Sequence, residues 1–299
     1  MPISAVIWAR PRTRHRGVQG RSATWPFIAL GALTLFVLAL AGCRHDDPPP
    51  PVETTPPVAR LRIIFPEGFT RREMVERVAA VREIAIDKRG VTPRLTGTAY
   101  ERASERARPP RAFRESWGGR SIEGFLFPST YEFSQYTPSA ALVRDQLEAF
   151  AREWRKVDLR YARSTNLTPY DVLIIASMIE KETVAPEERR LVAAVIYNRL
   201  RLDIALGIDA TIRYGRNVPG TEPLKQSDLD RDDPYNTRLR LGLPPTPIAN
   251  PGLASMRAAA NPARVGHLYF VRKPDGVHHF FTASKAEFDR KSCEYGFSC

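Results

Sequence analysis

The stretch that most constrains the fold of this chain runs from residue 168 to residue 202, TPYDVLIIASMIEKETVAPEERRLVAAVIYNRLRL. It opens with the residues that begin a helix. Thr168 suits the N-cap, Pro169 suits the first helical position, and Asp171 stands where a capping box has its acid. The eight residues 172–179 are apolar almost all the way round. This pattern predicts a helix buried on most sides.

Two carboxylates, Glu180 and Glu182, stand at the end of this apolar run, with Lys181 between them. A carboxylate beside apolar surface is costly unless it has a partner or a task. Residues two apart on a helix point about 200° away from each other. We therefore expect one glutamate to enter a cleft and the other to meet solvent or a cation such as Arg189. Taken alone, the spacing also allows two solvated, salt-bridged glutamates.

Composition limits the functional classes. The 299 residues are 43% hydrophobic and 26% charged, with a net charge of +12, which is ordinary for a soluble core apart from its basic excess. A basic chain meets nucleic acid, anionic lipid or another anionic polymer. The sequence has no nucleic-acid-binding motif, no zinc-spaced Cys/His set and no phosphate-loop glycines. We expect no nucleic-acid partner, no metal and no cofactor.

The N-terminal 59 residues predict an anchor and a spacer. Residues 1–24 are basic, 25–43 form an apolar segment, and 44–59 are a Pro-rich linker. The positive-inside rule places the N-terminus in the cytoplasm and the bulk of the chain outside. A second interpretation stays open, because residues 40–43 match a bacterial lipoprotein box in which Cys43 is lipidated.

A small α/β unit, residues 60–135, is expected next. Residues 61–65 read as a strand, Thr70 as the cap of a helix over 73–86, and residues 90–119 as an irregular insertion. A strand, a turn and a Thr-capped helix resemble half of a LysM-like module.

The remainder, residues 136–299, predicts a mixed helical domain. Helices are expected over 139–161, 186–202 and 253–260, with Pro- and Asn-rich loops over 234–252. Residues 267–271 and 277–281 predict a closing hairpin. His278 and His279 should face opposite sides of it and so should not form a metal pair. Beyond the hairpin, Cys293 and Cys299 either form a small disulfide or remain free thiols in a loose tail. The fold class is α+β.

The order of motifs is similar to that of one family. IASMIEKET, IYNRL, GIDATIRYG, PYNTR, GLPPTPIANPG and HLYFV, preceded by FPEGFT and SIEGFLFPSTYEF, resemble the endolytic murein transglycosylases of the YceG-like family. The resemblance covers Ile63 to Asp289. Ser129 departs from it where an acidic residue is common, and Ala210 departs where proline is frequent.

The resemblance implies a membrane-anchored lyase in the bacterial inner membrane, with its catalytic domain outside the cytoplasm. Such an enzyme cleaves nascent peptidoglycan strands internally, between N-acetylmuramic acid and N-acetylglucosamine, and leaves a 1,6-anhydromuramoyl end. Its expected partners are glycan strands, the membrane and peptidoglycan synthases. Matching the EKET motif places the catalytic glutamate on Glu182.

One carboxyl group suffices for this chemistry if it is protonated near neutral pH, and burial raises a carboxyl pKa. Candidates for positioning the sugars are Asp209, Thr211, Tyr235, Asn236 and Asn250, each of which has a structural reading as well. Two alternatives remain. One is a hydrolysing muramidase that uses Asp209 or Glu123 to activate water; the other is a non-catalytic peptidoglycan-binding scaffold.

Overall fold

The computed structural model describes residues 58–297. The predicted anchor over 25–43, Cys43, the linker up to residue 57 and Cys299 lie outside the described residues, and so does the disulfide alternative as far as Cys299 is concerned. Within 58–297, none of the helices has the length and apolar character needed to cross a membrane.

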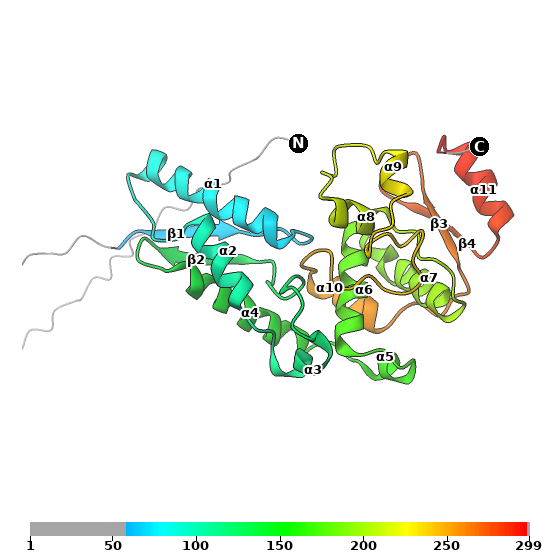
Figure 1. The fold of residues 1–299 in the computed structure, drawn as a ribbon, viewed down its shortest axis with the longest axis horizontal. Helices are drawn as coiled ribbons and strands as arrows, with labels where there is room; N and C mark the ends of the chain where they lie inside the picture. The colour runs from blue at the N-terminus through cyan, green and yellow to red at the C-terminus, as the bar shows by residue number, and fades with distance from the viewer. Residues whose placement is uncertain (1–57, 298–299) are drawn as a thin grey trace, which may run out of the picture. The chain divides into compact units, whose positions relative to one another are not determined.

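The described residues form helices and two small sheets, as expected for the α+β class (Figure 1). In chain order the elements are β1 (Arg60–Ile64), α1 (Arg71–Arg89), α2 (Gly97–Arg106), η1 (Arg111–Phe113), α3 (Arg114–Trp117), β2 (Thr130–Ser134), α4 (Ser139–Trp154), α5 (Arg160–Ser164), α6 (Pro169–Glu182), η2 (Pro186–Glu188), α7 (Arg189–Arg201), α8 (Asp209–Arg216), α9 (Gln226–Leu229), α10 (Leu253–Ala260), β3 (Tyr269–Arg272), β4 (His279–Thr282) and α11 (Lys285–Glu294).

The first sheet pairs β1 antiparallel with β2, and α1 and α2 lie between them in sequence. Leu61 stands opposite Phe133 and both are buried. The predicted cap of α1 is confirmed: the Thr70 hydroxyl accepts the backbone N–H of Glu73, whose side chain returns a bond to the Thr70 backbone. This capping box satisfies two N–H groups that the first turn would leave without partners.

The insertion predicted to be irregular contains a helix instead. α2 begins at the Thr96 N-cap and buries Tyr100, whose hydroxyl donates to Gln146 of α4 at 2.7 Å. The many arginines of this segment occupy the exposed side and conceal a short buried stripe of Gly97, Tyr100 and Ser104. A stripe built from small and polar residues gives little apolar periodicity, so the sequence did not reveal it.

The apolar helix predicted from the focal stretch is confirmed as α6. The Thr168 hydroxyl accepts the Asp171 N–H at 3.2 Å, and the Asp171 carboxylate accepts the Thr168 N–H at 2.8 Å. All eight residues from Val172 to Ile179 are buried. α6 packs against α7, α8 and α10, so it is enclosed on several sides and its last residue is held in a fixed place.

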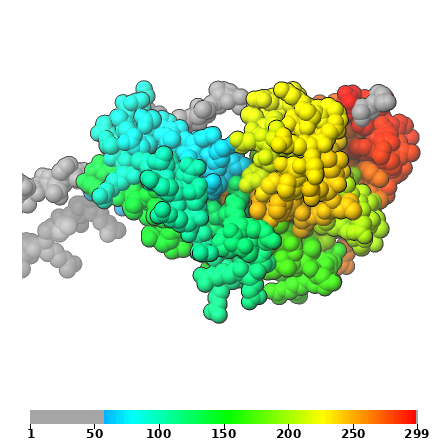
Figure 2. All heavy atoms as spheres, in the orientation of Figure 1, coloured from blue at the N-terminus to red at the C-terminus, as the bar shows by residue number. Residues whose placement is uncertain are grey.

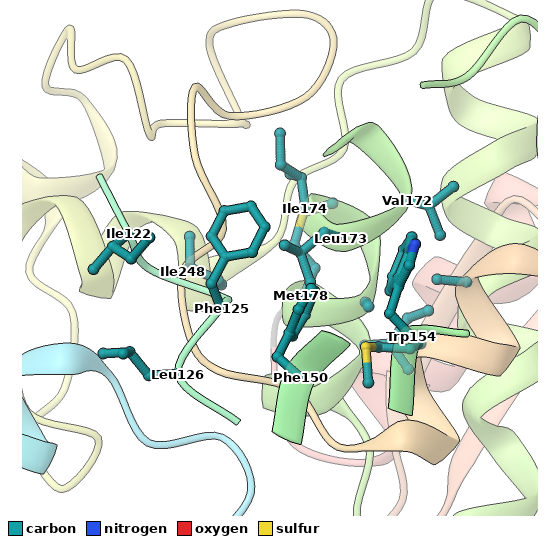
Figure 3. Packing of buried hydrophobic residues seen from close by; sticks show 14 of the residues in the cluster. Ile122, Phe125, Leu126, Phe150, Trp154, Val172, Leu173, Ile174, Met178 and Ile248 are labelled. Atoms are coloured by element: carbon teal, nitrogen blue, oxygen red, sulfur yellow. The ribbon is translucent and has the colours of Figure 1, made fainter. Parts of the chain in front are cut away.

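The core around α6 joins distant parts of the chain. Figure 3 shows Phe125 and Phe150 approaching the α6 side chains Leu173 and Met178. The ring centroids of Phe125 and Phe150 are 5.1 Å apart in an edge-on arrangement. Burial of each large apolar side chain contributes roughly 1.5–3 kcal/mol, so this cluster fixes the segment before residue 125 firmly against α6.

The C-terminal hairpin is confirmed, with β3 antiparallel to β4. His279 is buried and His278 is not, as strand alternation predicted. One expectation fails in this half of the chain. The helix predicted over 139–161 stops at Trp154 and resumes only at Arg160. Of the two alternatives left open for the C-terminus, the loose tail is not seen at Cys293, which lies in the helix α11, capped by the Ser284 hydroxyl that accepts the Glu287 N–H.

Candidate active site

A cavity of about 890 Å³ opens beside the C-terminal end of α6. Its walls come from the first turn of α1, residues 121 and 123, the end of α6, helix α8 with the segment after it, and the end of β3. In Figure 2 the blue-to-cyan atoms leading into α1 adjoin the yellow atoms of the α8–α9 segment, and both segments line this cavity. A hollow of this volume is in the range that holds small-molecule and oligosaccharide ligands.

Glu182 lines this cavity as the last residue of α6. Its carboxylate accepts the backbone N–H of Ala210 in the first turn of α8. Burial, and after it the nearby Asp209 carboxylate, raise the pKa of Glu182 to about 7, against the opposing influence of Arg272 and Arg213. A carboxyl with this pKa is partly protonated at neutral pH, so it can both give and take a proton.

Glu180 points elsewhere, which confirms that the two glutamates face different surroundings. Its carboxylate accepts the Gly252 N–H at 2.9 Å, and the Arg189 guanidinium lies 3.9 Å away. The Glu180 side chain is only 6% exposed and is not among the residues that line the cavity. Of the two glutamates at the end of α6, only Glu182 reaches the cavity.

Glu123 is a second buried carboxyl in the cavity wall, 3% exposed. It accepts the Arg71 backbone N–H at 2.9 and 3.1 Å, the Asn250 side-chain amide at 2.7 Å and the Tyr214 hydroxyl at 3.3 Å. Burial raises the pKa of Glu123 to about 7, and these donors hold it down. Because the donors come from three separate segments, Glu123 ties α1, α8 and the loop at residue 250 together.

Two of the predicted sugar-positioning residues line the cavity, Asp209 and Tyr235. The Asp209 carboxylate receives the Arg238 guanidinium at 2.7 and 2.9 Å. The Tyr235 hydroxyl shares a hydrogen bond with Thr246 at 2.8 Å, and its ring centroid lies 5.1 Å from that of Tyr214. An aromatic pair beside an acid is suited to pack against a sugar ring.

Asn250 is fully buried and bonded within the protein. Its oxygen accepts the N–H groups of Gly124 and Leu126, both at 2.9 Å, and its amide donates to Phe69 and Glu123. All of its hydrogen-bonding capacity is therefore used, and Asn250 is not among the cavity-lining residues.

Thr211 and Asn236 are also fully buried and outside the cavity lining. The Thr211 hydroxyl donates to the Ile208 carbonyl at 2.7 Å and lies 3.0 Å from the Thr237 hydroxyl. The Asn236 amide donates to two backbone carbonyls, both at 2.8 Å. In the structure these residues shape the loops around α8 and are not brought to Glu182.

Several cavity residues were not singled out from the sequence: Arg72, Arg213, Tyr214, Arg272 and Phe297. For Arg213 a signal was present, because residues 209, 210 and 213 share one face of a helix with four-residue spacing. Arg272 gave no such signal, since its place beside Glu182 depends on how the hairpin packs. Among residues 58–297, no cluster of three His, Cys, Asp or Glu side chains is arranged to hold a metal ion.

Comparisons with known proteins agree on one family. The sequence profile described as "YceG-like family" matches residues 52–294. Proteins named endolytic murein transglycosylase are similar to this chain: the one from Streptococcus pneumoniae R6 is 33% identical over 181 residues, 58% of this chain and 32% of that protein. The one from Bacillus subtilis 168 is 33% identical over 177 residues, 58% of this chain and 48% of that protein.

The matched region thus spans 32% to 48% of the length of these relatives. A solved structure, a putative YceG-like protein from Listeria monocytogenes, shares the fold with a TM-score of 0.62 at 24% identity, over 77% of this chain and 75% of that one. The family profile covers more than half of the sequence and all but a few of the described residues, so the chain belongs to the YceG-like family.

Proposed function

We propose that this protein is a peptidoglycan lytic transglycosylase with Glu182 as its acid and base. The observation that carries the proposal is a cavity carboxyl whose pKa is raised to about 7 and which, within residues 58–297, accepts a hydrogen bond from one backbone N–H alone. The names of the similar proteins support the same activity. The bond cleaved is the one between N-acetylmuramic acid and N-acetylglucosamine, inside a strand.

The reaction needs one group that changes its protonation state twice. Protonated Glu182 donates its proton to the glycosidic oxygen, and the bond from that oxygen to C1 of the muramoyl sugar breaks. The Glu182 carboxylate then takes the proton of the C6 hydroxyl of the same sugar, and that oxygen bonds to C1. The product is a 1,6-anhydro sugar, the acid is regenerated, and no water is consumed.

The bonding of the other cavity carboxylates favours this one-acid scheme over hydrolysis. A hydrolysing glycosidase needs a second carboxylate as base or nucleophile. Glu123 already accepts hydrogen bonds from three residues, and Asp209 is held by two bonds from Arg238. Glu123 is therefore a poor base for water, whereas the second Asp209 oxygen accepts no hydrogen bond within residues 58–297. The alternative is a muramidase, and analysis of the reaction products distinguishes it from a transglycosylase.

The proposal extends to the rest of the chain. The antiparallel pairing of β1 with β2, with α1, α2, η1 and α3 between them in sequence, supports a LysM-like subdomain over 60–135, followed by the catalytic domain over 136–299. We place the protein at the bacterial inner membrane with both domains outside the cytoplasm. Its anchor is either a single span over 25–43 or a lipid on Cys43, and peptidoglycan synthases are its proposed partners.

The test is Glu182→Gln in the purified full-length protein, assayed on isolated peptidoglycan with mass spectrometry of the products. We expect 1,6-anhydro ends from the wild type and a rate lower by roughly 10²–10⁴-fold in the variant, the usual contribution of a general acid. Glu180→Gln is the matched control, since it removes an equal charge two residues away. Reducing ends in place of anhydro ends would indicate hydrolysis, and binding without turnover would indicate a scaffold.

A further inference from the structure

The cavity carries positive charge that the protein does not neutralise. Its cationic residues are Arg71, Arg72, Lys181, Arg213 and Arg272, and its acidic residues are Glu73, Glu123, Glu182 and Asp209. Three of the acids are already engaged: Glu73 closes the cap of α1, Asp209 holds Arg238, and Glu123 accepts its three donors.

The cations differ in how they are bound. Arg71 lies 3.6 Å from Glu105, Lys181 donates to the Gly68 carbonyl, and Arg213 donates to two backbone carbonyls. Arg72 and Arg272 are exposed, and within residues 58–297 neither guanidinium has a hydrogen bond or an ion pair. An arginine offers five N–H donors in a planar fork that matches a carboxylate. The guanidinium groups of Arg72 and Arg272 therefore remain available to a ligand in the cavity.

Arg272 is held in this position by the buried pair of His279 and Glu188. It stands opposite His279 in the hairpin register. The His279 backbone N–H donates to Glu188 at 2.9 Å, and its ring Nδ1 lies 2.7 Å from the same carboxylate. Glu188 follows α6 by six residues, so this contact fixes the hairpin beside the helix that ends in Glu182. The guanidinium of Arg272 is thereby presented to the cavity on a rigid element.

The chemistry of the proposed substrate says what these guanidinium groups can bind. A glycan strand of N-acetylated amino sugars is uncharged along its backbone, and in intact strands the lactyl group of the muramoyl sugar is tied up in an amide. The negative charges reside on the carboxylates of the peptide stem. Sugar hydroxyls and N-acetyl carbonyls can each accept single bonds from a guanidinium, but a carboxylate accepts two parallel bonds and also offsets its charge.

Accordingly, we propose that Arg72 and Arg272 form a subsite for the carboxylates of the peptide stem carried by the muramoyl sugar that is cleaved. This inference rests on the proposed function. Such a subsite makes the enzyme selective for strands whose peptide stems are present and charged. A bound carboxylate also offsets the Arg272 charge that holds down the pKa of Glu182, which favours the protonated acid at the start of the reaction.

The test compares two substrates that differ only in stem charge: strands with native stems, and the same strands with their stem carboxylates converted to amides before the enzyme is added. We expect kcat/KM of the wild-type full-length protein to be roughly tenfold higher on the native strands, the scale of a hydrogen bond to a charged group. Arg72→Gln and Arg272→Gln should each reduce this ratio, and the double variant should bring it close to one.

Arg216→Gln is the matched control, because Arg216 of α8 pairs with Asp228 of α9 and is not a cavity residue. It should keep the wild-type ratio. Because each variant is judged by the ratio of two substrates, a general loss of stability affects both rates alike. Equal cleavage of native and amidated strands by the wild type would overturn the subsite and leave the transglycosylase intact. Absence of anhydro products from both strands would instead overturn the proposed function.

Discussion

Glu123 and Glu182 face the same cavity, and burial raises the pKa of each to about 7. They differ in their bonding. Glu123 accepts hydrogen bonds from Arg71, Asn250 and Tyr214, whereas Glu182 accepts one from the Ala210 backbone. A raised pKa is thus shared by a carboxyl that joins three segments and a carboxyl that is free to react. The pKa alone does not tell these two carboxyls apart. The number of hydrogen-bond donors bound to each one does distinguish the carboxyl that joins segments from the carboxyl that is proposed to react.

The largest effect expected from this comparison is on the rate. Glu182→Gln should abolish most activity, by roughly 10²–10⁴-fold, because the amide has no proton to transfer. The variant should unfold in the same cooperative transition as the wild type. Rates come from the release of anhydro ends, and folding from thermal unfolding. Activity within tenfold of wild type would assign the acid to another residue.

Glu123→Gln should mainly lower stability. Its amide keeps one accepting oxygen but turns a donor toward the Arg71 N–H, the Asn250 amide or the Tyr214 hydroxyl. Loss of an acceptor for buried donors costs about 1–3 kcal/mol each, and about 1 kcal/mol corresponds to roughly 2–4 °C in Tm for a domain of this size. The measurement is thermal unfolding beside Glu182→Gln. If Glu123→Gln were as stable as the wild type and as inactive as Glu182→Gln, the two roles would be reversed.

The pH dependence of the rate should report on Glu182, whereas the pH dependence of stability should include both carboxyls, because the pKa of Glu123 is also raised to about 7. Activity that needs protonated Glu182 should fall as pH rises through about 7. The same folded-state pKa lies above the ordinary 4.5, so the native state holds protons that the unfolded state has lost, and stability decreases as pH rises between these values. Glu182→Gln removes this contribution. It should therefore be more stable relative to wild type at pH 8 than at pH 5, measured by urea unfolding at both.

The smallest effect is expected from Glu180→Gln. The amide oxygen still accepts the Gly252 N–H, and the lost partner, Arg189, is 3.9 Å away. Removal of the Glu180 charge also relieves Glu67, whose pKa is raised by burial and then by Glu180. On the rate we expect the smallest change, activity within a few-fold of wild type; because Glu180 is nearly buried, the free energy of unfolding should fall by about 1–3 kcal/mol. A loss as large as that of Glu182→Gln would mean that both glutamates serve the chemistry.

The sequence predicted the elements whose signals are local. The Thr168–Asp171 capping box, the apolar run of α6 and the Pro-Asp-Gly turn of the hairpin each act within a few residues. The divergence of Glu180 and Glu182 followed from helix geometry alone. α2 and α11 were missed because their exposed faces are rich in charge and their buried faces are short, so packing and not periodicity decides them.

The site was predictable only in part, for the same reason. Glu182, which the motif singles out, lines the cavity with Asp209 and Tyr235, but Asn250 and Thr211 turn inward to bond backbone groups. A polar residue in a Pro-rich loop can contact a ligand or can hydrogen-bond the backbone of the loop itself. Which of the two it does depends on where the loop lies in the fold. The structural importance of Glu123 becomes visible only when residues 71, 214 and 250 meet.

The cavity is assembled from segments near residues 71, 123, 182, 213 and 272, which implies an order of events. A ribosome releases the N-terminal segments first, and contacts between residues two hundred positions apart form late. Until the hairpin that carries Arg272 has docked through His279 and Glu188, one wall beside Glu182 is missing. We therefore expect a partly made or partly folded chain to lack the proposed activity until the whole domain is complete.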